Sequence, residues 1–207
     1  MRTTHTYLVR LAHWVAAIAI LILVLSGLDI FRAFPSFGSK LPESDGLPLP
    51  SKPGLGGWLG GALQWHFTFA WLFAAAGLAY AVELARGGWR RVWIAKEELA
   101  GIVPMIRYYL RIGPKPEQRD LYNPLQKSAY LAMIGCGAAS LLSGLALAQP
   151  VQLSGLVTVF GGWQGTRLVH FVSMALIVGF IPGHLLMVAI AGKPAIYAMV
   201  VGRSPRK

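Results

Sequence analysis

The sequence is poor in charged residues and has almost no cysteine. Only 13% of its 207 residues are Asp, Glu, Lys or Arg, whereas 55% are hydrophobic and the mean hydropathy is +0.54. An average soluble domain carries about 25% charged residues, so this composition excludes an ordinary soluble protein and indicates a membrane protein. Cys136 is the single cysteine, which excludes an internal disulfide and any iron–sulfur cluster held by several cysteines.

Four long apolar stretches have no Asp, Glu, Lys or Arg in their interiors. Each can cross a hydrocarbon core of about 30 Å at about 1.5 Å per residue. Because lipid offers no hydrogen bonds to the backbone, each stretch must be an α-helix. We therefore predict an all-α fold, in which residues 1–207 form one transmembrane four-helix bundle. Its spans are predicted at residues 8–28, 61–84, 125–148 and 166–191.

Acidic residues are also few, with 8 Asp and Glu against 19 Lys and Arg, which gives a net charge of +11. Such a balance can indicate nucleic-acid binding, but here the basic residues are concentrated in two places. Nine Lys and Arg lie between residues 86 and 127, and four more follow the last span. By the positive-inside rule, both termini and the loop between the second and third spans are cytoplasmic, and no nucleic-acid partner is expected. Residues 96–113 of this loop are predicted to form a short helix in the headgroup region.

Four of the five histidines lie inside the predicted spans, where a polar ring usually faces the bundle interior and has a partner. His170 and His184 are fourteen residues apart, which is about 40° short of four helical turns. Both rings therefore leave the same face of the last span, about 21 Å apart along its axis. They define two sites, one above the other. His5, in the polar N-terminal tail, is interpreted as an ordinary surface residue.

The alternating directions of the spans predict which histidines meet. His66 lies near the non-cytoplasmic start of the second span, at the depth of His170, whereas His13 lies near the cytoplasmic start of the first span, at the depth of His184. Two imidazoles from different helices at one depth are what bis-histidine ligation of a haem requires. Since the chain has no C-x-x-C-H sequence, any haem is expected to be bound noncovalently.

Histidines within a span can also bind zinc, relay protons or pack through hydrogen bonds. A zinc site needs three or four ligands close together, and a proton relay is expected to include Asp or Glu, but the span interiors supply no carboxylate. For any one histidine alone, hydrogen-bonded packing remains an alternative, and for His13 it is as good as ligation because that residue lies closest to the headgroups. Four histidines in two depth-matched pairs favour haem.

Two arginines can serve the haem propionates. Arg10 precedes His13 by three residues and Arg167 precedes His170 by three, so each arginine lies one turn nearer the membrane surface on the same helix face. The alternative is that both residues only mark helix ends.

At these residues the sequence resembles the bacterial four-helix di-haem cytochrome b family, the membrane subunits of formate dehydrogenases, nickel–iron hydrogenases and thiosulfate reductases. The resemblance covers nearly the whole chain. The segment "VRLAHWVAAIAILILVLSGLDIF" is similar to the family's first helix, and "YNPLQKSAYLAMIGCGAASLLSGLAL" is similar to the third helix of the thiosulfate-reductase branch. The histidines fourteen residues apart match the family's ligand helix.

The resemblance implies two haems b, held by His66 with His170 on the non-cytoplasmic side and by His13 with His184 on the cytoplasmic side. It also implies that the chain carries electrons between the quinone pool of a respiratory chain and a catalytic redox partner, a molybdopterin or iron–sulfur protein at the periplasmic side. The expected location is the bacterial inner membrane. The chain itself then supplies electron transfer and no substrate chemistry.

Quinone is expected near the cytoplasmic haem, because Pro182 and Gly183 loosen the last span beside His184. Arg10 and Lys127 can offer donors to a quinone oxygen there, although a kink that only fits the macrocycle is an equal alternative. Two other functions remain open, a stand-alone superoxide:quinone oxidoreductase of the same fold and a haem-free membrane scaffold or transporter.

Overall fold

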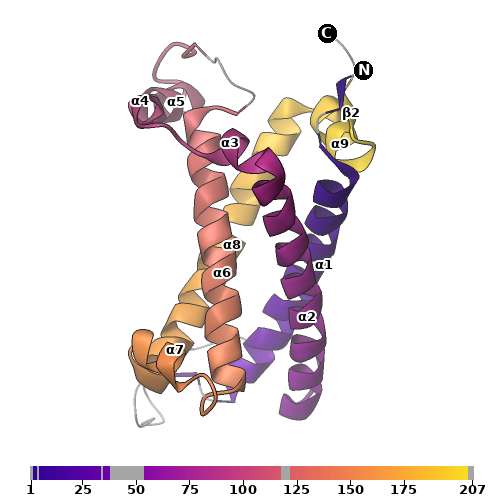
Figure 1. Cartoon of the computed structure of the whole chain (residues 1–207), viewed down its shortest axis with the longest axis vertical. Helices are drawn as coiled ribbons and strands as arrows, with labels where there is room; N and C mark the ends of the chain where they lie inside the picture. Colours follow the sequence, from indigo (N-terminus) through magenta and orange to yellow (C-terminus); the bar gives the residue numbers. More distant parts are fainter. Residues whose placement is uncertain (1, 4, 34, 38–53, 118–121, 205–207) are drawn as a thin grey trace.

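Four long antiparallel helices form the body of the protein (Figure 1). The structure, a computed structural model, describes residues 2–3, 5–33, 35–37, 54–117 and 122–204. The four helices are α1 (Tyr7–Arg32), α2 (Leu59–Glu83), α6 (Pro124–Ala148) and α8 (Gly162–Ala191). All four are long and apolar enough to cross a membrane, which confirms the prediction of an all-α transmembrane four-helix bundle.

The helix ends follow local sequence signals. The Thr6 hydroxyl accepts a hydrogen bond from Val9 N at 3.3 Å at the start of α1. Asn123 and Gln126 form a reciprocal capping box at the start of α6, with Pro124 at the first helical position. The second span is longer than predicted, because Leu84–Gly88 continues α2 as a π-helical turn and α3 (Trp89–Val92) follows it.

The four helices are arranged as two hairpins. In the first hairpin, α1 packs along most of the length of α2, and in the second, α6 packs along α8, with the short α7 (Ser154–Val159) in the connection between them. Contacts between the two hairpins are sparse. Apart from Lys127, the residues buried within the four helices are small: Ala12, Ala19, Ser26, Gly61, Ala62, Ala76, Ser143, Ala146, Thr166 and Ser173. The two hairpins are therefore packed less closely against each other than the two helices within each hairpin.

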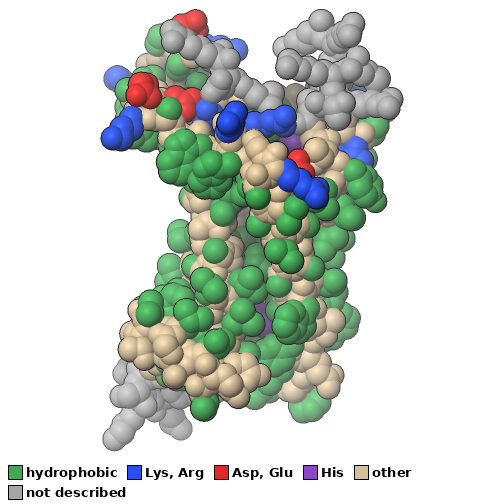
Figure 2. All heavy atoms as spheres, viewed as in Figure 1, with side chains coloured by type: hydrophobic (Ala, Val, Ile, Leu, Met, Phe, Trp, Pro, Cys, Tyr) green, Lys and Arg blue, Asp and Glu red, His purple; other side chains and the backbone are tan. Residues whose placement is uncertain are grey.

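Both chain termini lie at one end of the bundle, opposite α7 (Figure 1). Here β1 (Arg2–Thr3) pairs antiparallel with β2 (Arg203–Ser204), which follows α9 (Lys193–Val200). In the face shown in Figure 2, Lys and Arg gather at this end. We call it the basic end, defined by Arg90, Arg91, Lys96, Arg107, Arg111 and Lys193, and we call the opposite end the α7 end.

The connection between the second and third spans was predicted to contain one short helix over residues 96–113. It contains two, α4 (Lys96–Leu99) and α5 (Ile102–Tyr109). They are fixed to α6 by polar contacts. Lys127 Nζ donates to Glu98 Oε1 at 2.6 Å, and Asn123 Nδ2 donates to Tyr109 Oη at 3.1 Å.

Candidate functional site

The four histidines of the spans meet in two pairs. The ring centroids of His66, from α2, and His170, from α8, are 6.1 Å apart with 64° between the ring planes. Those of His13, from α1, and His184, from α8, are also 6.1 Å apart, with 59° between the planes. The structure thus brings together the same residues that the depth argument pairs, and α8 contributes one ring to each pair. Histidine side chains are visible at two levels between the helices in Figure 2.

The spacing of the rings suits a metal ion between them. An imidazole nitrogen binds a metal at about 2 Å, so two rings on opposite sides of one ion have centroids about 6 Å apart. Among the residues that the structure describes, no third His, Cys, Asp or Glu joins either pair. Each pair therefore offers two nitrogen ligands, as an iron already held by a porphyrin requires.

The ring of His170, at the α7 end, is held by α6. Its Nδ1 lies 3.0 Å from the carbonyl oxygen of Ser140 and 3.1 Å from Ser143 Oγ. The Ser143 hydroxyl donates its own hydrogen to the Ala139 carbonyl at 2.5 Å, so its oxygen is an acceptor toward the ring. With acceptors on both sides, Nδ1 of His170 must carry the hydrogen. Nε2 then keeps the lone pair that a metal needs.

His66 is held in the same way by α1. Its Nδ1 lies 3.1 Å from Ser26 Oγ, and Ser26 Oγ donates to the Ile22 carbonyl at 2.7 Å. Ser26 and Ser143 are both 0% exposed, so water does not compete for either contact. Both ligand candidates at the α7 end are therefore presented as the same tautomer.

A glycine next to each serine lets the ring approach. A Cβ atom at Gly27 would lie 3.2 Å from His66 Cε1, and one at Gly144 would lie 3.1 Å from His170 Cε1. Both distances are shorter than ordinary van der Waals contact. The two Ser-Gly pairs belong to an identical tetrapeptide, Leu-Ser-Gly-Leu, at residues 25–28 and 142–145. This repeat was not among the predicted features of the site, although the two identical tetrapeptides were its signal in the sequence.

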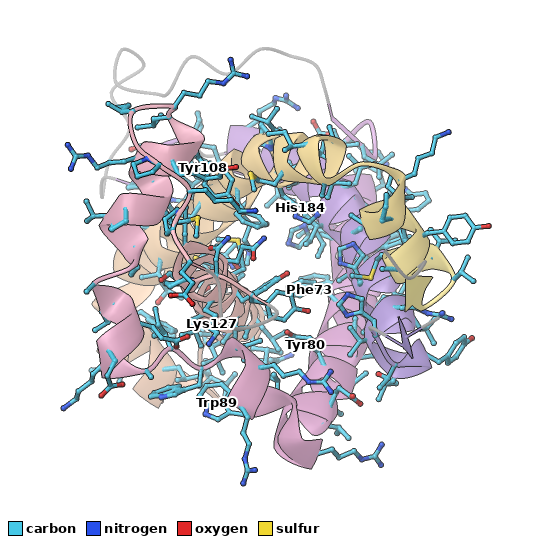
Figure 3. The ribbon with its side chains drawn as sticks, turned by 90° about the horizontal axis from the view of Figure 1, so that it is seen from above. Phe73, Tyr80, Trp89, Tyr108, Lys127 and His184 are labelled. Carbon is cyan, nitrogen blue, oxygen red and sulfur yellow. The ribbon has the colours of Figure 1, made fainter. Side chains whose placement is uncertain are left out.

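The pair at the basic end has different surroundings. Trp14 meets the His13 ring edge-on at 5.4 Å between centroids, and Phe180 stacks on His184 at 5.5 Å. Within the described residues, neither ring makes a side-chain hydrogen bond that would fix its tautomer. Viewed from the basic end, His184 lies with Phe73 and Tyr80 around the space that the long helices enclose (Figure 3). The ring neighbours of this pair are therefore the aromatic side chains of Trp14 and Phe180.

The two arginines predicted to serve propionates differ in their hydrogen-bond partners. Arg10 lies with its guanidinium over the Tyr7 ring, 5.6 Å from the centroid, and its buried Nε has no hydrogen-bond partner among the described residues. An anionic group beside His13 would satisfy this nitrogen. Arg167 instead donates to the Ser36 carbonyl at 2.7 Å and to Gln164 Oε1 at 2.9 Å. These contacts support the alternative role of Arg167 in fixing the end of its helix.

Two sequence-based interpretations at the basic end need correction. His5 is half-buried and not an ordinary surface residue. Burial, together with the nearby charges of Arg91 and Arg10, lowers the pKa of His5 below its usual 6.5. Lys127 was expected to offer a donor to quinone, but its side chain is only 4% exposed and its ammonium is paired with Glu98. Lys127 therefore has a structural role between α4 and α6.

Comparison with known proteins gives the family of the chain. Residues 4–202 match the model of a family described as prokaryotic cytochrome b561. The chain is also similar to a putative protein-methionine-sulfoxide reductase subunit, YedZ1, of Azospira oryzae. The two are 38% identical over 200 residues, which cover 96% of each chain.

Proposed function

Because the chain belongs to the prokaryotic cytochrome b561 family, whose members are membrane electron-transfer proteins that bind haem b, we propose that it carries electrons across a membrane through two b-type haems. The observation that supports this proposal most strongly is the presence of two histidine pairs with the same 6.1 Å separation. We assign His66 and His170 to the haem at the α7 end, and His13 and His184 to the haem at the basic end.

Haem, when bound, supplies a reversible one-electron change between ferric and ferrous iron. The chain's own contribution is to place the two sites. Along α8 the ligands are fourteen residues apart, or about 21 Å, which is most of the thickness of a hydrocarbon core of about 30 Å. Sparse contacts between the two hairpins support room for two flat macrocycles between them. Arg10 is the residue that we assign to a propionate of the basic-end haem.

The proposed orientation follows from charge. Basic residues concentrate at the end that holds both termini and α4–α5, so we place this end in the cytoplasm of a bacterium and the α7 end in the periplasm. The membrane is then the bacterial inner membrane.

We further propose that the chain is one subunit of a larger oxidoreductase. The similar protein of Azospira oryzae is named as a subunit of a putative protein-methionine-sulfoxide reductase. By this likeness we propose a catalytic redox partner for the present chain. From the family resemblance we expect this partner to carry a molybdopterin or iron–sulfur centre and to dock at the α7 end. The described residues of this chain then conduct electrons without transforming a substrate.

Quinone is placed at the basic end, beside His13 and His184. Pro182 and Gly183 are both exposed on the surface of α8, and a Cβ atom at Gly183 would meet nothing within 4 Å. The helix surface next to His184 is therefore open to a lipid-soluble headgroup. Arg10 is a candidate donor to it, whereas the ion pair of Lys127 argues against a second donor there.

Haem quantitation on the purified chain tests the central proposal. We expect a reduced-minus-oxidised spectrum of b type and two noncovalent haems per chain by pyridine haemochrome analysis. One haem or none in fully loaded protein would contradict two sites, and a haem-free protein would favour the scaffold or transporter. Superoxide added to the isolated chain with quinone tests the remaining alternative, for which rapid quinone reduction would be expected.

A quinone-analogue inhibitor tests the quinone site. Titrated into protein with both haems, it should shift the signal that is lost in His13→Ala protein. A shift confined to the haem that His13→Ala protein retains would place quinone at the α7 end instead.

A further inference from the structure

We propose that Ser26 and Ser143 are positioning residues, which hold His66 and His170 in one tautomer and thereby tune the haem at the α7 end. This inference rests on the proposed haem function. It concerns two hydroxyl groups that lie behind the ligands and would not touch iron, porphyrin or quinone.

The two serines occupy equivalent places in the two hairpins. In each hairpin the first helix carries the Leu-Ser-Gly-Leu tetrapeptide, and the second helix carries the histidine that lies against it. The distances repeat closely: serine Oγ to histidine Nδ1 is 3.1 Å in both, and the glycine contact is 3.2 Å in one and 3.1 Å in the other. The α7-end site is therefore built from two copies of one local arrangement.

The direction of the hydrogen bonds assigns the role. Each serine hydroxyl donates back to a carbonyl four residues earlier in its own helix, Ile22 for Ser26 and Ala139 for Ser143. The oxygen lone pairs are left facing the imidazole Nδ1–H. A hydrogen bond accepted from Nδ1–H fixes the ring orientation and makes Nε2 a more basic ligand. A more basic ligand favours ferric over ferrous iron, so the serines should lower the reduction potential of this haem.

The other site supplies an internal reference. Within the described residues, the His13 and His184 rings have aromatic neighbours and no comparable hydroxyl acceptor. Removing a serine at the α7 end should therefore change the reduction potential of the haem there and leave that of the basic-end haem unchanged. If the serines only fill space where the helices touch, the midpoint potential and spectrum of neither haem should change.

The matched control is Ser140, one turn before Ser143 on α6. Among the described residues its buried Oγ has no hydrogen-bond partner, and its carbonyl, which accepts from His170, is retained in an alanine variant. Ser140→Ala therefore removes a buried hydroxyl from the same helix without removing a contact to the ligand.

The experiment is a spectropotentiometric titration of the haem-loaded protein, with electron paramagnetic resonance spectra of the ferric state. Ser26→Ala, Ser143→Ala and the double variant are compared with Ser140→Ala and wild type, each also in a His13→Ala background that isolates the α7-end haem. We expect a more positive midpoint potential and a moved low-spin signal for this haem, largest in the double variant. The affinity of the α7-end site for haem should fall about tenfold.

The two possible failures are distinguishable. An unchanged potential and spectrum in a fully loaded double variant would overturn the positioning role and leave the haem function intact. Equal shifts in Ser140→Ala and Ser143→Ala, or shifts of both haems together, would also overturn it. A wild-type protein that binds no haem would overturn the proposed function and this inference together.

Discussion

Substitution of Gly144 by alanine is the sharpest test of how tightly the second hairpin holds its ligand. The added Cβ would lie 3.1 Å from His170 Cε1 and 3.5 Å from its Nδ1, whereas ordinary contacts begin at 3.4 Å. The ring must therefore move by about 0.3 Å, away from the Ser143 hydroxyl and the Ser140 carbonyl that fix it.

Two effects of this substitution have opposite signs. Replacing glycine by alanine inside a helix favours the helix by about 1 kcal/mol, so the fold of α6 should tolerate it. Disturbing the contacts behind a metal ligand typically costs about tenfold in affinity, or about 1.4 kcal/mol. We therefore expect Gly144→Ala protein to be as stable as wild type but to lose the α7-end haem about ten times more readily.

The matched control is Gly135→Ala, on the same helix, where a Cβ would meet nothing within 4 Å. Both substitutions favour the helix equally, but only Gly144→Ala places a new Cβ atom close to His170. Haem transfer to excess apomyoglobin, followed at the haem absorption band, measures the difference. If Gly144→Ala and Gly135→Ala proteins lose haem at the same rate, the close approach of α6 to His170 has no role in ligation.

Three further predictions concern the pairs and the basic end. His66→Ala should remove the α7-end haem and keep the other, whereas His13→Ala should do the reverse; equal loss of both signals in folded protein would contradict the pairing. Lys127→Met should lower the midpoint temperature of thermal unfolding by several degrees, because the Glu98 carboxylate loses its partner. Glu98→Gln in the same background should recover part of the loss. Because the pKa of His5 is lowered in the folded state, its stabilising contribution is present above pH 6.5 and is lost as the pH falls through the folded-state pKa. The protection factors of amides near the N-terminus, which correct for the intrinsic pH dependence of exchange, should therefore fall between pH 7.5 and 5.5 in wild type but not in His5→Asn protein.

The spans and the histidine pairs were accessible from the sequence because they depend on long-range regularities. Membrane thickness sets the length of each helix, and alternation of direction sets the depth of His13, His66, His170 and His184. Only the helix ends were misplaced, since the end of an apolar run does not show where a helix stops. Tyr7–Arg32, for example, continues past the predicted boundary at residue 28.

Features that depend on contacts between distant residues were missed. The break of the 96–113 segment into α4 and α5 accompanies an ion pair that joins Glu98 to Lys127, 29 positions along the chain. The pairing of β1 with β2 joins the two ends of the sequence, where two-residue strands leave no periodic pattern. Similarly, a serine in an apolar helix is usually interpreted as a packing residue. Its contact with a histidine on another helix becomes evident only in the structure.

The sharing of α8 between the two histidine pairs has a consequence for how the protein is made. His13 and His66 enter the membrane with the first hairpin, but both of their partners lie on the last of the four long helices. During synthesis neither pair exists until α8 has been inserted and has packed against the rest. A chain that stalls after α6 would present two single imidazoles and no pair. Under the proposed ligation, a chain acquires its haems only after translation has passed the final span.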